Sequence, residues 1–164
     1  MLLRFLPIPK KVIWGKSNFF KNFGFNEANI GELWMIGSEN KIINFNSITL
    51  SDFSKKFPKM IFGNRFPLPR FPILIKYIST SDWLSIQVHP DDKFAIQTES
   101  EPWGKTEMWF FLETEKNAKI VCGLKKKVTK EEFISLINNS SFNEILNYVD
   151  VSENDWVLIK PGVV

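Results

Sequence analysis

The chain has 164 residues, of which 44% are hydrophobic and 24% are charged. This length and composition fit one ordinary globular domain and exclude an intrinsically disordered chain. Lys and Arg number 21 against 18 Asp and Glu, so the net charge of +3 is too small to indicate a nucleic-acid-binding protein.

The chain has one cysteine, which excludes an intramolecular disulfide framework and a cysteine-based zinc finger. No segment approaches the roughly 18 consecutive apolar residues that a membrane-spanning helix needs. The N-terminal residues contain two prolines and no small-residue cleavage site, which does not fit a signal peptide. We therefore expect a cytoplasmic protein with no membrane or nucleic-acid partner.

Short strand-like segments dominate the chain, rich in Ile, Val, Phe and Trp and bounded by Gly, Asn, Ser or Pro. In chain order, strands are expected at Lys11–Trp14, Glu32–Ile36, Lys41–Asn44, Pro72–Ile78, Trp83–His89, Thr106–Thr114, Ala118–Cys122 and Trp156–Lys160. Together they predict a mainly β protein, a barrel or jelly roll decorated with helices.

Helices are expected to be short and few. One covers Ser51–Met60, bent or ended by Pro58, and another covers Asp91–Gln97. A helical pair is expected at about 130–148, because Thr129–Glu132 and Ser141–Glu144 both fit the capping-box pattern. The strand at 156–160 is followed at once by the last residues of the sequence, so its edge is expected to be open and to favour self-association.

The first segment that suggests chemistry is Leu84-Ser-Ile-Gln-Val-His-Pro-Asp-Asp92. On a strand, alternate side chains face the same side, so Ser85, Gln87 and His89 share one face and the apolar residues share the other. His89 is the single histidine of the chain. No site that needs two histidines can therefore be built from this sequence.

The second such segment is Trp103-Gly-Lys-Thr-Glu-Met-Trp-Phe-Phe-Leu112. Lys105, Glu107 and Trp109 fall on one face of a strand, and a carboxylate among aromatic residues is costly to bury unless it is paired. Two alternatives remain open from the residues alone. Glu107 forms a structural ion pair with Lys105 and His89 is a structural histidine, or Glu107, His89 and the Gln87 amide bind a divalent cation such as zinc.

Several segments together resemble the type I mannose-6-phosphate isomerases, in particular their short bacterial branch with a cupin fold. The matching segments are Trp14-Gly15, Gly31-Glu-Leu-Trp34, Leu84-Ser-Ile-Gln-Val-His-Pro-Asp-Asp92, Gly104-Lys-Thr-Glu-Met-Trp109, Gly123-Leu-Lys-Lys126 and Asp155-Trp-Val-Leu-Ile-Lys-Pro-Gly162. Their order and spacing match over essentially the whole chain. The combination of Gln-x-His-Pro with Lys-x-Glu-Met-Trp is far more specific than either motif by itself.

The resemblance implies that residues 1–164 form a single cupin-type jelly-roll domain with short helical insertions, in which the C-terminal strands are missing. It also implies one zinc ion per chain, held by Gln87, His89 and Glu107. The family's fourth ligand, a later histidine, is expected beyond Val164, so zinc binding is expected to be weakened.

The implied reaction is the interconversion of mannose 6-phosphate and fructose 6-phosphate through a cis-enediol. By resemblance, Lys105 is catalytic and contacts the hexose 6-phosphate, and Trp14 and Ser85 face the sugar pocket. The alternative is a catalytically incompetent cupin fragment that binds at most a metal or a sugar phosphate.

Overall fold

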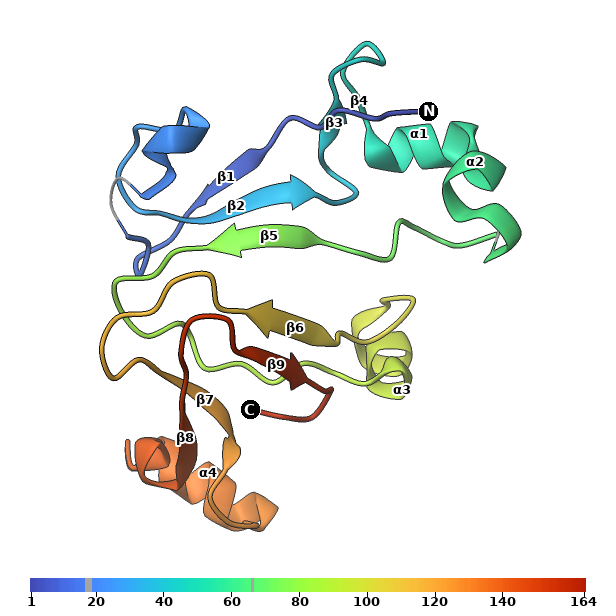
Figure 1. Ribbon diagram of the computed structural model, residues 1–164. Helices are drawn as coiled ribbons and strands as arrows, with labels where there is room; N and C mark the ends of the chain where they lie inside the picture. The colour runs from blue at the N-terminus through green and yellow to red at the C-terminus, as the bar shows by residue number, and fades with distance from the viewer. Residues whose placement is uncertain (17–18, 66) are drawn as a thin grey trace. The chain divides into compact units, whose positions relative to one another are not determined.

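The structure is a computed structural model that describes residues 1–16, 19–65 and 67–164. Contacts between residues divide the chain into two units, Met1–Leu84 and Ser85–Val164. Each unit has its own sheets and helices (Figure 1), and both are described separately below.

The first unit is built on a three-stranded antiparallel sheet of β1 (Ile8–Lys11), β2 (Ile30–Ile36) and β5 (Ile75–Ile78), with β2 in the middle (Figure 1). The 3-10 helix η1 (Phe19–Phe23) packs its buried Phe20 against Ile30 and Leu33 of β2. The expected strand at Lys11–Trp14 is wrong by three residues, because the chain turns after Val12, where the Gly15 N–H donates to the Val12 carbonyl.

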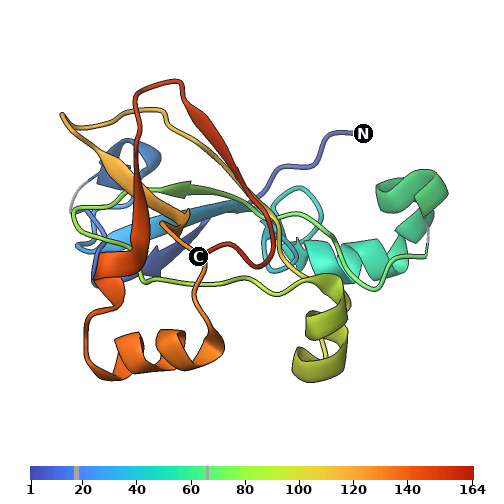
Figure 2. The same ribbon diagram turned by 90° about the horizontal axis from the view of Figure 1, so that it is seen from below.

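A second hydrophobic cluster of the first unit joins Ile42, Leu50 and Phe53. It lies where a small antiparallel pair, β3 (Lys41–Ile42) and β4 (Ile48–Thr49), meets the following helices (Figures 1 and 2). These helices are α1 (Leu50–Lys56), α2 (Pro58–Phe62) and the 3-10 turn η2 (Gly63–Arg65). The helix expected at 51–60 is present, and the proline begins its second part, at the helix position that proline favours.

The second unit contains two antiparallel strand pairs and three helical segments. β6 (Glu107–Phe110) pairs with β9 (Trp156–Ile159), and β7 (Lys119–Leu124) pairs with β8 (Leu146–Asp150). The helical segments are α3 (Asp92–Phe94), continued by the π-helical turn η3 (Ala95–Glu99), then α4 (Lys130–Asn138) and the 3-10 turn η4 (Phe142–Ile145). Both α4 and η4 lie at the end of the β7–β8 pair where the chain passes from one strand to the other (Figures 1 and 2).

The helical pair expected at 130–148 is only half correct. Thr129 and Glu132 form the predicted capping box at the start of α4. Ser141 makes no side-chain cap, and the chain forms the short turn η4 and then strand β8. These residues form a strand and not a second helix because they pair with β7, which also buries Leu146 fully.

The strand expected at Trp83–His89 is not formed, because in the described part of the chain this segment has no partner strand. The described strands make four separate sheets and no closed barrel, so the fold is a mixture of sheet and helix in which strands are prominent. Among the described residues, none of the helices has the length and apolar character needed to cross a membrane.

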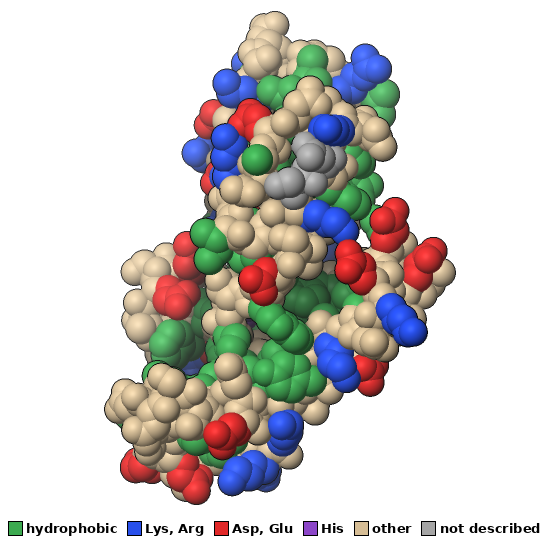
Figure 3. Space-filling model, turned by 90° about the vertical axis from the view of Figure 1, so that its left-hand side faces the viewer, with side chains coloured by type: hydrophobic (Ala, Val, Ile, Leu, Met, Phe, Trp, Pro, Cys, Tyr) green, Lys and Arg blue, Asp and Glu red, His purple; other side chains and the backbone are tan. Residues whose placement is uncertain are grey.

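One face of the β6–β9 sheet is apolar and open to solvent. Residues opposite each other in an antiparallel pair point to the same face, and this face carries Met108, Phe110, Trp156 and Leu158, each between 48% and 66% exposed. The opposite face carries Glu107 and the buried Ile159. In the view of Figure 3, hydrophobic side chains also reach the surface, among acidic and basic side chains that are interspersed rather than gathered by sign.

Candidate functional site

Within the second unit, the only histidine of the chain meets a carboxylate. His89 Nε2 lies 3.4 Å from Glu107 Oε1, and both side chains are 15% exposed. His89 lies in the extended segment before α3, and Glu107 is the first residue of β6. This distance exceeds the roughly 2.7–3.2 Å of a good hydrogen bond. The imidazole and the carboxylate are therefore close neighbours without a strong hydrogen bond between them.

The backbone holds these two segments together by close contact at Gly104. The Gly104 N–H donates to Asp92 Oδ1 at 2.8 Å, and the Lys105 N–H donates to the Pro90 carbonyl at 3.1 Å. A Cβ atom at position 104 would lie 2.3 Å from the Pro90 carbonyl oxygen, so only glycine allows this approach. On the other side of the site, the Gly162 N–H donates to the carbonyl of His89 at 2.9 Å.

Two further groups satisfy the Glu107 carboxylate. Lys105 Nζ lies 2.9 Å from Oε1, and the Trp109 indole N–H donates to Oε2 at 3.0 Å. Burial by itself would raise the pKa of Glu107, but the hydrogen bond and charge of Lys105, the Trp109 hydrogen bond and the nearby His89 outweigh it. Together they hold the pKa of this carboxyl below its ordinary value. Glu107 is therefore an anion at neutral pH.

The donor atoms present suit zinc in kind. An imidazole nitrogen beside an ionised carboxylate is a usual part of a zinc site, in which four ligands surround the ion. Among the described residues, no three His, Cys, Asp or Glu side chains lie together, so His89 and Glu107 could supply only two of the four ligands of such a site. The ammonium of Lys105 contacts Glu107 Oε1, the carboxylate oxygen that faces His89 and would bind the ion.

The other predicted site residues are placed differently. Gln87 and Ser85 are exposed on the extended segment before His89, and within the described residues no hydrogen bond joins Gln87 to the His89–Glu107 pair. Trp14 belongs to the first unit and is only 8% exposed. Its ring packs so closely on Gly31 that a Cβ there would lie 2.6 Å from the ring, which leaves it little surface for a ligand.

Sequence patterns alone do not predict the contacts that support the site. Trp109 was recognised as sharing a face with Glu107, and the structure adds the hydrogen bond between them. Asp92 lies in the first turn of the helix expected at Asp91–Gln97, and its carboxylate also accepts a hydrogen bond from the N–H of Gly104, twelve positions later in the sequence. The repeated Glu-x-Trp pattern, at Glu32–Trp34 and again at Glu107–Trp109, is the signal that was available for the first of these contacts.

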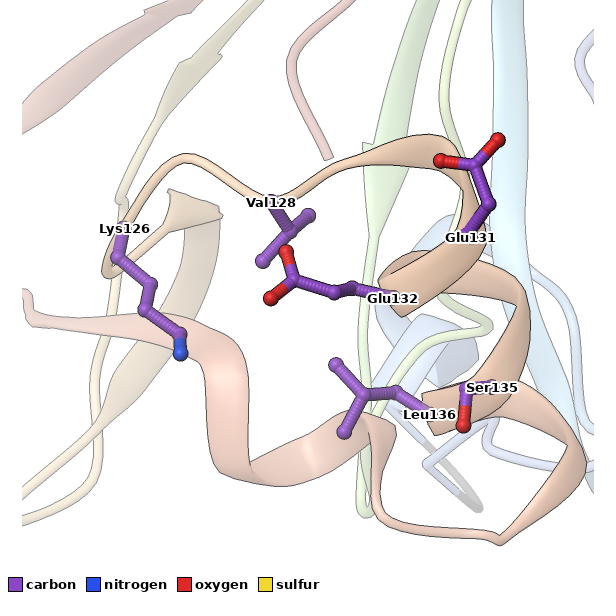
Figure 4. Close-up of a pocket in the computed structure, with 6 residues that line it drawn as sticks. All are labelled: Lys126, Val128, Glu131, Glu132, Ser135 and Leu136. Carbon is purple, nitrogen blue, oxygen red and sulfur yellow. The ribbon is translucent and has the colours of Figure 1, made fainter.

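A separate hollow lies beside α4 and carries none of these residues. It has a volume of about 390 Å³ and is lined by Lys126, Val128, Glu131, Glu132, Ser135 and Leu136 (Figure 4). Glu132 already accepts a hydrogen bond from the Thr129 backbone N–H in the capping box. The hollow is therefore the open side of a capped helix start, and neither His89 nor Glu107 lines it.

Comparison with known proteins gives consistent matches. The model of a family described as phosphomannose isomerase type I, catalytic domain, matches residues 2–104, which include Gln87 and His89 and end before Lys105. The mannose-6-phosphate isomerase ManA of Bacillus subtilis is 31% identical over 99% of this chain and 53% of its own length. The mannose-6-phosphate isomerase of Streptococcus mutans is 30% identical over 93% of this chain and 49% of its own length.

Solved structures agree with these sequence matches. The crystal structure of the mannose 6-phosphate isomerase from Bacillus subtilis matches with a TM-score of 0.86 and 27% identity, over 98% of this chain and 53% of that one. The apo mannose 6-phosphate isomerase from Salmonella typhimurium shares the fold, with a TM-score of 0.66 at 15% identity over 98% of this chain and 64% of that one. The chain spans about half the length of the curated relatives that it matches.

Proposed function

We propose that this chain, which belongs to the type I phosphomannose isomerase family, supplies the metal-binding and substrate-binding part of an isomerase. The proposed reaction interconverts mannose 6-phosphate and fructose 6-phosphate. The observation that carries the proposal is that His89 Nε2 and Lys105 Nζ lie 3.4 and 2.9 Å from the same oxygen of the ionised Glu107 carboxylate. His89 lies in the part of the chain that the family model matches.

The proposed metal ligands are His89 Nε2, Glu107 Oε1 and the side-chain oxygen of Gln87. A fourth ligand would come from sequence that corresponds to the half of the relatives that this chain does not cover. A bound zinc ion would supply Lewis-acid polarisation of the sugar oxygens at C1 and C2. The hydrogen bond from Gly162 to the His89 carbonyl supports this arrangement, because it brings the 161–164 turn against the backbone of a proposed ligand.

Isomerisation moves a proton between C2 and C1 of the open-chain sugar through a cis-enediol, with no net oxidation or reduction. Lys105 is half-exposed and carries its positive charge next to Glu107, where it would stabilise the negative charge that develops on the enediol oxygen. The exposed Ser85 would contact the sugar. The 164 residues would form part of a cupin-type jelly roll whose remaining strands lie in the unmatched part of the relatives.

A second candidate function is a cupin module that binds a metal or a sugar phosphate without turnover. The chain's coverage of about half of each curated relative favours it, because strands and side chains of the other half would be needed to complete a barrel and its site.

A chimera tests the proposal against this alternative. Residues 1–164 would be joined to the part of Bacillus subtilis ManA that the match leaves out, and isomerisation of mannose 6-phosphate would be measured with and without zinc. We expect zinc-dependent turnover with kcat of about 1–1,000 per second, lost in His89→Ala. Lys119→Ala is the control, since this lysine pairs with Asp150 away from the site. A folded chimera that binds zinc through His89 yet shows no turnover would establish the binding module instead.

A further inference from the structure

The structure contains the same three-residue constellation twice, once in each unit. In the first unit, Lys76 Nζ lies 2.7 Å from Glu32 Oε1, and the Trp34 indole N–H donates to Glu32 Oε2 at 2.7 Å. In the second unit, Lys105 Nζ forms an ion pair with Oε1 of Glu107, and the Trp109 indole N–H donates to Oε2. Both tryptophans follow their glutamate by two positions on a strand, so the indole reaches the carboxylate along one face.

The two constellations differ in what else reaches the carboxylate. Glu32 is 15% exposed, and its two oxygens are matched by one ammonium and one indole. Glu107 is equally buried, and its Oε1 has a second neighbour, His89 Nε2, at 3.4 Å. A lysine, a glutamate and a tryptophan are therefore enough to build a structural ion pair. His89 is what distinguishes the second copy.

In both copies the lysine contacts one carboxylate oxygen and the indole N–H donates to the other, and in the second copy this fixes how the Glu107 carboxylate is oriented. A carboxylate whose Oε2 accepts an indole N–H at 3.0 Å cannot turn that oxygen toward the imidazole without losing the bond. Oε1 is then the oxygen that stays beside His89. Outer contacts that fix a metal-binding carboxylate in this way commonly change metal affinity by about 10–100-fold when removed.

We infer that Trp109 is a positioning residue, whose indole N–H holds Glu107 so that Oε1 alone is directed at a cation shared with His89. The inference rests on the proposed metal site. It predicts a ligand that binds through one oxygen, and it assigns the tryptophan of the Glu-Met-Trp segment a part in cation binding beyond packing.

The test uses the whole 164-residue chain, the metal alone as the probe, and Trp34 as the matched control. Trp109→Phe and Trp34→Phe each remove one indole–carboxylate hydrogen bond and keep an aromatic ring. We expect Trp109→Phe to weaken binding of Zn²⁺ by about 10–100-fold and to change the visible spectrum of bound Co²⁺. Trp34→Phe should leave both unchanged.

An NMR measurement on the unmodified chain needs no variant to fold well. The indole N–H signals of a ¹⁵N-labelled sample, assigned by sequential methods, are followed as Zn²⁺ is added. The Trp109 signal should shift with the same saturation as metal binding, while the Trp34 signal stays in place.

The outcomes separate the two claims. If neither the wild-type chain nor the chimera described above binds zinc, or if zinc binds equally well after His89→Ala, the proposed metal site fails and the inference fails with it. If zinc binding requires His89 but Trp109→Phe binds it within twofold of wild type, or the Trp109 indole signal does not move, only the positioning role is overturned.

Discussion

Replacing Gly104 with alanine should separate the two segments that form the site. The new Cβ would lie 2.3 Å from the Pro90 carbonyl oxygen and 2.5 Å from the Asp91 carbonyl carbon, and neither backbone atom can rotate away. To reach 3.0 Å, the shortest separation that real Cβ atoms show, the first contact must lengthen by 3.0 − 2.3 = 0.7 Å. The segment carrying Lys105 and Glu107 would have to move back by about this much.

That movement breaks the hydrogen bonds that hold the segments together. The bond from Gly104 to the Asp92 carboxylate is 2.8 Å long, and the bond from Lys105 to the Pro90 carbonyl is 3.1 Å long. A bond to a charged group contributes about 1.5–3 kcal/mol and a neutral one about 0.5–1.5 kcal/mol. We expect Gly104→Ala to lower the free energy of unfolding by about 2–4 kcal/mol and to weaken zinc binding at least tenfold.

Urea unfolding and a zinc titration measure the two effects, with Gly37→Ala as control. At Gly37 the nearest obstacle is a methyl group of Leu74 at 2.8 Å, the end of a flexible side chain that can turn aside. Gly37→Ala should lower the free energy of unfolding by only about 1 kcal/mol and leave zinc binding unchanged. A Gly104→Ala chain as stable as the control, with wild-type zinc affinity, would refute the argument that this close approach holds the site together.

Two further predictions concern the carboxylate. Because the pKa of Glu107 is lowered in the folded state, the stability it contributes is present above its ordinary value of 4.5 and is lost as the pH falls through the lowered pKa. The difference in free energy of unfolding between wild type and Glu107→Gln should therefore shrink as the pH falls below 4.5, and a difference that stays constant in urea titrations would contradict it. Lys105→Met removes an ammonium 2.9 Å from the oxygen proposed to bind the cation. It should strengthen zinc binding about tenfold, from a repulsion of about 1–2 kcal/mol in a water-like medium, while turnover by the chimera is lost; weaker zinc binding would exclude this competition.

Local patterns predicted the parts of the fold that depend on neighbours in sequence. The strand at 32–36 lies within β2, and the Thr129–Glu132 capping box begins α4 as expected. The same pattern at Ser141–Glu144 failed, because the following apolar residues pair with β7. An apolar run with a good strand partner overrides a capping signal, and the partner cannot be read from the run itself.

The site divides in the same way. The contact of Lys105 with Glu107 was predictable, because residues two apart on an extended segment share a face. The Asp92–Gly104 hydrogen bond was not, since it joins the start of α3 to a loop twelve positions later, and no sequence period sets that spacing. Residues 83–89 show the limit most clearly. Their alternation fits a strand, but in the described part of the chain no partner strand is beside them, and Ile86 and Val88 remain about half exposed.

The comparison of the two Lys–Glu–Trp constellations shows why Glu107 suits a site that exchanges its partners. Glu32 has one ammonium for its one negative charge, so the removal of either partner leaves a partly buried charge unpaired. Glu107 has an ammonium and an imidazole on the same oxygen, and the ammonium side chain is 49% exposed. Lys105 can therefore leave Oε1 for solvent or for an anionic substrate at little cost in desolvation. In the proposed reaction, binding of a cation between Glu107 and His89 would favour that release, so filling the proposed metal position would also free Lys105 for the proposed sugar-phosphate substrate.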